Sequence, residues 1–169
     1  MAKINTVGQA LYAVREDGKA LKDVPEKLRT AEVCLEAVKN NYNEGALQYV
    51  PEEFKTAELC LEAVKANGNG GALQYVPEKL KTAELCLEAV ETIGNDGALE
   101  FVPEKLKTAE LCLEAVKTYS NGVALKYVPW GQLNLTVPAM EEICREAVSG
   151  PSNDGALEFV PEKLKTAEL

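Results

Sequence analysis

One short segment is copied along almost the entire chain, and this periodicity constrains the fold more than any other feature. Starting at Pro25, a proline recurs every 26 residues as far as Pro129, and the next one of the series, Pro161, follows after 32 residues. A cysteine lies nine residues after each of the first four of these prolines. The cysteines are Cys34, Cys60, Cys86, Cys112 and Cys144. A fixed period of this length indicates units stacked in an array, each in contact only with its neighbours.

The clearest copy, residues 69–94, predicts two helical elements. Residues 72–76 form a short apolar run that ends before Pro77, which lacks an N–H and disfavours helical angles in the preceding residue. We expect one or two turns there, in part of the 3₁₀ type. Thr82 then precedes a longer helix to about Glu91, and its hydroxyl can accept a hydrogen bond from the first turn as an N-cap.

The longer helix of each unit is apolar around about half of its circumference. In the clearest copy the apolar positions are Ala83, Leu85, Cys86, Leu87, Ala89 and Val90, and the stripe left over carries Glu84, Glu88 and Glu91. A face this broad suits a helix held between two neighbours, and neither helix of a unit can bury its apolar face alone. The predicted fold class is therefore all-α, an α-solenoid of short helix–turn–helix repeats of about 26 residues each.

We expect a single repeat domain over residues 1–169. A lone helix at 5–16 opens it, because Thr6 aligns with the capping threonines and Ala10 with the cysteines. Five full repeats follow over about 18–150. A partial sixth repeat occupies 153–169, where the sequence is identical to residues 95–111.

The fifth repeat departs from the pattern by an insertion at 130–140, which adds six residues between Pro129 and Cys144 and replaces the Glu-Lys-Leu segment. The insertion contains Trp130, the only tryptophan of the chain. Two interpretations remain open. Trp130 either fills the space of the missing leucine, or marks a contact site on a loop that bulges from the stack.

Composition argues against several classes of function. Acidic residues outnumber basic ones by 27 to 18, giving a net charge of −9 that opposes nucleic-acid binding. No uncharged run approaches the roughly 18 residues of a membrane span. Histidine, the commonest general base, is absent, and acidic pairs such as Glu84 and Glu88 recur unit after unit on a helix surface. We therefore expect no enzyme, no nucleic-acid partner and no membrane partner.

The regular cysteines are predicted to be small buried apolar side chains. Equivalent residues of adjacent units lie about one helix spacing apart, roughly 8–10 Å. A disulfide needs Cα atoms within about 7 Å, and zinc needs its sulfurs about 2.3 Å away. The Asn-Asp-Gly segments lack the acidic spacing of a calcium loop, so Asp96 and Asp154 are expected to cap helices. No metal or cofactor is expected, and free thiols fit a cytoplasmic location.

The repeating unit resembles a bacterial tandem helical repeat family catalogued as a domain of unknown function. The residues that carry the resemblance are Ala-Leu-x-Tyr/Phe-Val-Pro-Glu-x-Leu-x-Thr-x-Glu-Leu-Cys-Leu-Glu-Ala-Val. The resemblance runs from about Ala20 to Leu169 and is close in four consecutive units. It implies a helical repeat fold and carries no catalytic or ligand residue. The alternation of short and longer helices is similar, more distantly, to leucine-rich-repeat-variant proteins.

The repeats differ most in the connections that follow the longer helix. These connections and the insertion hold the predicted partner-contact residues, Trp130, Tyr42, Ile93 and Tyr119. The function we expect is a non-enzymatic repeat scaffold that binds an unidentified protein or peptide. Two alternatives stay open: a structural element that associates head to tail with other copies, or a fragment of a larger multi-repeat protein.

Overall fold

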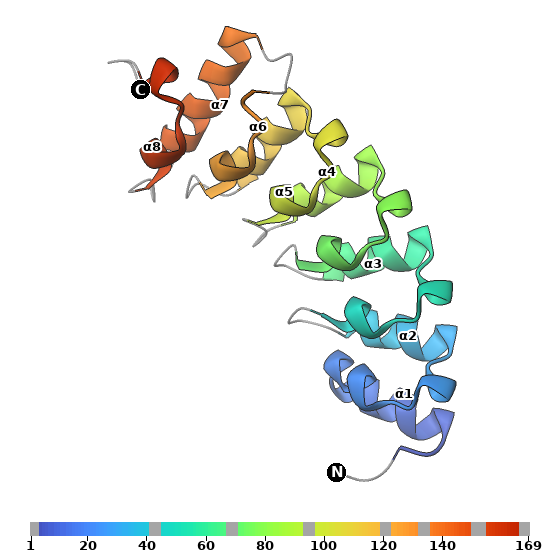
Figure 1. The fold of residues 1–169 in the computed structure, drawn as a ribbon. Helices are drawn as coiled ribbons and strands as arrows, with labels where there is room; N and C mark the ends of the chain where they lie inside the picture. Colours follow the sequence, from blue (N-terminus) through green and yellow to red (C-terminus); the bar gives the residue numbers. More distant parts are fainter. Residues whose placement is uncertain are drawn as a thin grey trace.

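The computed structural model describes residues 4–40, 45–66, 71–92, 97–118, 123–131, 136–149 and 155–165. Over these ranges the regular structure is helical and includes no strand, which confirms the all-α prediction. The helices stack in one curved array, with the two chain termini at its opposite ends (Figure 1).

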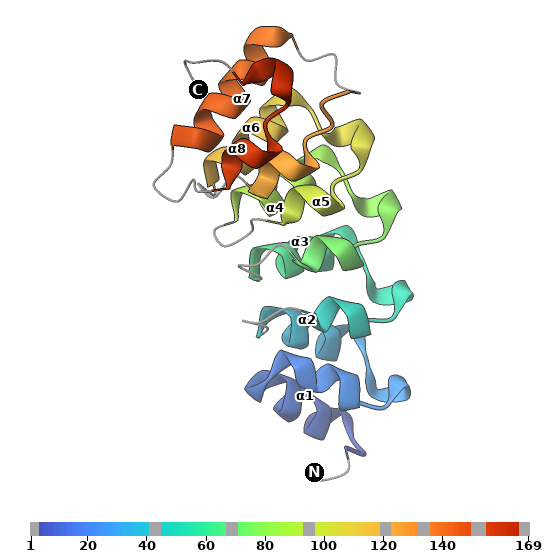
Figure 2. The same cartoon turned by 60° about the vertical axis from the view of Figure 1, so that its left-hand side comes forward.

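Each layer of the array pairs one α-helix with the short helix that follows it. In the described chain the layers are α1 (Val7–Glu16) with η1 (Gly18–Asp23), α2 (Ala31–Lys39) with η3 (Ala46–Tyr49), α3 (Ala57–Ala66) with η5 (Gly71–Tyr75), α4 (Ala83–Glu91) with α5 (Ala98–Phe101), α6 (Ala109–Thr118) with η8 (Val123–Tyr127), and α7 (Val137–Ser149) with α8 (Ala156–Phe159), where η marks a 3₁₀ helix. Successive long helices pack against one another, and so do successive short helices (Figures 1 and 2). The chain is therefore an α-solenoid.

The Pro-Glu-x-Leu segment, predicted as a turn, is itself one turn of 3₁₀ helix. These turns are η2 (Glu26–Leu28), η4 (Glu52–Phe54), η6 (Glu78–Leu80), η7 (Glu104–Leu106) and η9 (Glu162–Leu164). Proline suits the position just before each turn because its fixed φ, −55° at Pro77, matches the geometry and no N–H is needed there. The Leu80 N–H closes the turn by donating to the Pro77 carbonyl at 2.8 Å. They follow one another along the outer edge of the bend in Figure 1.

Threonine hydroxyls cap the long helices as predicted. The Thr82 Oγ1 accepts a hydrogen bond from the Leu85 N–H at 3.2 Å. The same bond recurs at Thr6, Thr30, Thr56 and Thr108. The lone first helix α1 thus begins at a cap of the same kind, and Ala10 is 0% exposed in the place that cysteine takes elsewhere. The predicted caps Asp96 and Asp154 lie outside the described residues.

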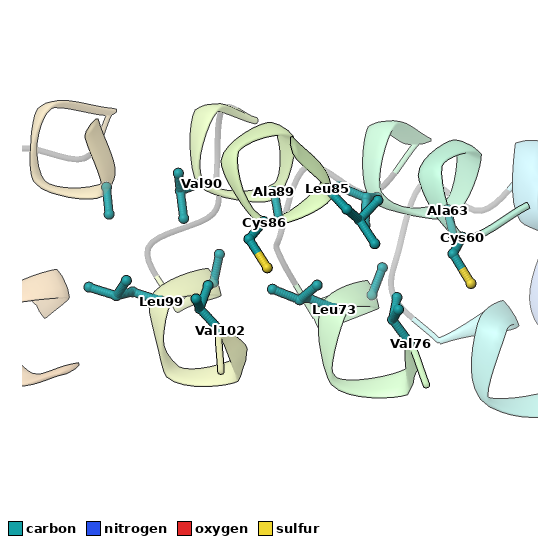
Figure 3. Close-up of a cluster of buried hydrophobic side chains, with 14 of the residues drawn as sticks. Cys60, Ala63, Leu73, Val76, Leu85, Cys86, Ala89, Val90, Leu99 and Val102 are labelled. Atoms are coloured by element: carbon teal, nitrogen blue, oxygen red, sulfur yellow. The ribbon is translucent and has the colours of Figure 1, made fainter. Parts of the chain in front are cut away.

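The core is a continuous apolar layer between the row of long helices and the row of short helices. Figure 3 shows Cys86 and Ala89 pointing from α4 toward the short helices, and Leu73 pointing from η5 toward the next layer. One leucine per layer is at most 2% exposed, at Leu21, Leu47, Leu73, Leu99 and Leu125. The equivalent Leu157 of α8 is 50% exposed, because no further layer in the described chain covers it.

The insertion of the fifth repeat is partly absorbed into a helix. α7 has 13 residues where α6 has 10, and the Met140 N–H donates to the Thr136 carbonyl at 3.1 Å in its first turn. The bulge expected over 130–140 therefore does not extend to residues 137–140, since an extra helical turn can join the stack with its backbone hydrogen bonds made. Residues 132–135 lie outside the described ranges.

None of the helices in the described ranges combines the length and the apolar character needed to cross a membrane.

Candidate interaction surface

Of the predicted partner-contact residues, only Trp130 falls in the described chain; Tyr42, Ile93 and Tyr119 lie outside it. Trp130 is partly buried and packs against the apolar core. Its backbone N–H donates to the Val128 carbonyl at 2.9 Å, so the chain turns tightly there. This placement agrees with the interpretation that the indole fills space vacated by the missing leucine.

The five cysteines lie inside the core. Each is 0% exposed, and burial raises the pKa of Cys86 to about 11 and that of Cys112 to about 12. The thiolate is the reactive form of cysteine, and burial disfavours it here. Within the described ranges, no group of three or more potential ligands could hold a metal ion. The cysteines act as small apolar side chains, as predicted.

Three basic side chains hold the ends of short helices that lie 20 residues ahead in the sequence. The Lys107 Nζ donates to the Tyr127 carbonyl, 20 residues ahead, at 3.2 Å and pairs with Glu104 at 2.6 Å. Lys81 and Arg29 make the equivalent bonds to the carbonyls of Phe101 and Tyr49, each at 3.0 Å. These bonds satisfy carbonyls at the ends of short helices, which have no partner within the helix.

Sequence analysis counted these basic side chains only toward the net charge. The signal that could have identified them is their strict spacing, because Arg29, Lys55, Lys81 and Lys107 recur every 26 residues. In the fifth repeat, Ala139 stands at the equivalent place and has no amine to offer. Lys107 is only 5% exposed, whereas Lys105, two residues earlier, is exposed.

The negative charge of the protein is segregated to the long helices. Five long helices contain twelve glutamates, three lysines and one arginine, which gives them a combined net charge of −8: α2, α3, α4, α6 and α7. The whole chain carries −9, so everything else is nearly neutral. These charges lie on the side of the long helices that faces away from the short helices, since the opposite side forms the core. We call this side the outward face.

A row of leucines crosses the outward face beside the glutamates. It consists of Leu35, Leu61, Leu87 and Leu113, one in each of four successive long helices. Leu35, Leu61 and Leu113 are partly buried at its edge, and Leu87 is 37% exposed. In these four layers the outward face therefore presents the same apolar side chain, bordered by carboxylates.

The outward face is most acidic at α4. Glu91 stands where the other units have Lys39, Lys65 and Lys117, so α4 carries three glutamates and no basic residue. In the described part of the chain no ion pair joins these glutamates to a basic side chain. Hydrogen bonds from its own backbone N–H and from the Thr82 hydroxyl lower the pKa of Glu84, which favours the charged form.

The outer side of the first layer differs from the outward face. A hollow of about 1150 Å³ lies between α1 and η1, lined by Ile4, Asn5, Gly8, Gln9, Tyr12, Ala13, Asp17, Lys19, Ala20, Lys22, Asp23, Pro25 and Lys27. Its position is the one that a preceding layer would cover. Gln9 and Asp23 stand where other layers have Leu85 and Tyr49, so this side of the first layer is more polar than the equivalent side of those layers.

Sequence comparison places the repeat in a known family. The family model described as "Domain of unknown function (DUF4116)" matches residues 10–55, 31–81, 56–107 and 82–131, which together span 122 of the 169 residues. The chain belongs to the DUF4116 family. Each match covers about two layers, and the last three matches begin about one repeat apart, so the DUF4116 pattern is the repeat described above. No curated protein and no solved structure matched the chain.

Proposed function

We propose that this DUF4116 array is a non-enzymatic scaffold that binds a protein or peptide segment on the outward face of α3, α4 and α6. The observation that carries the proposal is the row of partly exposed leucines bordered by glutamates, of which those on α4 have no ion pair in the described chain. Surface leucines scattered singly need no explanation, but here a leucine recurs at the same place in four successive layers. Stacked repeats commonly bind partners along an extended surface that several repeats share.

The character of the buried groups supports a role without catalysis. Active sites gather ionisable side chains whose pKa values are shifted by shelter and by close neighbours. Among described side chains, Lys107 is the buried charged one, and its amine is used by a backbone carbonyl and a glutamate. The remaining strong shifts belong to core cysteines that face other apolar side chains.

A selection from random peptides tests the proposal. A display library of short random peptides would be panned on the full chain, on the double variant Leu61→Ser/Leu87→Ser, and on Leu157→Ser as a matched control. Leu157 is also a half-exposed leucine, but it lies at the end of the stack. Circular dichroism would confirm that each variant keeps its helices.

We expect enriched peptides that bind the natural chain and the Leu157→Ser control equally and lose binding to the double variant. Selection that enriches no peptide, or peptides indifferent to Leu61 and Leu87, would refute binding at the outward face.

A second candidate function, self-association, is favoured by Leu157. This side chain is covered in every equivalent inner layer and is half-exposed at the last one. Head-to-tail stacking would place it against the hollow of the first layer, whose Gln9, Lys22 and Asp23 are polar. That mismatch makes the scaffold the better-supported function.

Sedimentation equilibrium over a range of concentrations tests self-association. A mass that rises with concentration and returns to the monomer value in Leu157→Asp would support it. A monomer mass at every concentration would remove it.

A further inference from the structure

We propose that the segment bound by the outward face is a basic, extended peptide in the polyproline II conformation, with an apolar residue at every third position. This inference rests on the proposed binding function and adds the chemistry and conformation of the partner. It is argued from the spacing of the leucine row and from the charge around α4.

The spacing of the leucines selects the conformation of the peptide. Leu61, Leu87 and Leu113 hold the same place on helices that pack side by side, so they repeat at the helix spacing of roughly 8–10 Å. A polyproline II helix advances about 3.1 Å per residue and returns to the same face every three residues, a repeat of about 9.3 Å. Each apolar side chain on one edge of such a peptide would meet one leucine.

Other regular conformations do not match this spacing. A β-strand advances about 3.3 Å per residue and returns to one face every two residues, so same-side residues lie about 6.6 or 13 Å apart. An α-helix returns to nearly the same face every seven residues, a repeat of about 10.5 Å, which lies above that spacing. The polyproline II repeat of about 9.3 Å falls inside it, so this conformation matches the leucine row best.

The charge of the outward face selects basic residues for the other positions. Glu84, Glu88 and Glu91 surround Leu87 on the surface of α4, and none has a basic partner in the described chain. On the neighbouring α6, Glu114 is paired with Lys117 at 3.0 Å, and on α2 Glu36 is paired with Arg15 at 2.9 Å. α4 has a net charge of −3, whereas α2, α3 and α6 each have −1, so a lysine or arginine of the peptide would be held at the middle of the leucine row.

Fluorescence anisotropy with a synthetic probe tests this inference on the full chain. The probe is a labelled peptide of four Leu-Lys-Pro triplets. One control peptide contains the same residues reordered so that no two leucines are three apart, and a second has glutamate in place of lysine. We expect the probe to bind with an affinity that falls as salt rises, the reordered peptide to bind about tenfold more weakly, and the acidic peptide not to bind.

The chain itself supplies a matched pair of charge variants. Glu91→Lys installs the residue that three other units already have there, and Glu53→Lys does the same on η4, where the equivalent positions are Lys27, Lys79 and Lys105. Both substitutions change the net charge equally, and neither introduces a residue foreign to its helix. We expect Glu91→Lys to weaken probe binding about fivefold at low salt and Glu53→Lys to leave it nearly unchanged.

The outcomes separate this inference from the function on which it rests. Equal weakening by the two variants would show general charge attraction and overturn the assignment to α4. Failure of the probe, while selected peptides still require Leu61 and Leu87, would overturn the partner chemistry and leave the scaffold function standing. If neither the probe nor any selected peptide binds, both proposals fall.

Discussion

Leu99 and Leu157 offer a direct measure of how much stability each layer receives from the next. They occupy the same position in two helices of identical sequence, Ala98–Phe101 and Ala156–Phe159. Leu99 is 1% exposed and Leu157 is 50% exposed. The same substitution at both sites therefore changes the local helix propensity equally and differs only in the packing that it removes.

We expect Leu99→Ala to lower the free energy of unfolding by about 3 kcal/mol, near the lower end of the range for fully buried leucines. Leu157→Ala should cost about 1 kcal/mol, since half of that side chain already meets water and its removal leaves no closed cavity. Urea unfolding followed by circular dichroism measures both values. Units of a repeat array can unfold separately, so amide hydrogen exchange should be measured on the same variants to show which layers are destabilised. Leu99→Ala should speed amide exchange in α5 and in its neighbour α6.

Equal costs at the two sites would refute the reasoning, because they would show that the leucine stabilises its own helix rather than the contact between layers. A cost at Leu157 that grows with protein concentration would instead indicate that another copy covers this end.

Three further outcomes are expected. Lys107→Met should lower the free energy of unfolding by about 1.5 kcal/mol through loss of the bond to the Tyr127 carbonyl, while exposed Lys105→Met stays within about 0.5 kcal/mol, by urea unfolding. Thr82→Ala should cost about 1 kcal/mol in the same assay, because the Leu85 N–H loses its cap. The native thiols should resist Ellman's reagent until the chain unfolds, and stability should fall as pH rises above about 9 toward 11 to 12. Buried cysteines keep their protons there while unfolded ones lose them, and a melting temperature independent of pH in that window would contradict this.

Features that depend on local chemistry or on strict periodicity were predictable from the chain alone. A threonine cap needs only its own helix, and Thr82 bonds the first turn as expected. The 26-residue period required a stack, and the apolar arc of the longer helix required burial on two sides. The 3₁₀ helix at the Pro-Glu-x-Leu segment was not predicted, because a single 3₁₀ turn is too short to show a periodic pattern in the sequence.

The interaction surface was not predictable in the same way. The expected contact residues lay in the connections and at Trp130, and Trp130 packs against the core. The leucine row was counted with the buried apolar arc, since helical periodicity places Leu87 only at the edge of that arc. Whether an edge position is covered depends on how closely the neighbouring helix approaches, and only the packed structure shows that Leu87 is 37% exposed.

The sequence by itself determined that this protein is an all-α solenoid with capped helices and cysteines in its core, because these properties follow from spacing that every copy repeats. The tertiary structure decided what identical residues do in different layers. Leu99 and Leu157 have the same neighbours in sequence and different exposure, and Lys105 and Lys107 lie two residues apart with opposite surroundings. The physical reason is that burial, and with it the strength of a hydrogen bond or an apolar contact, is set by the next layer of the stack rather than by the chain on either side.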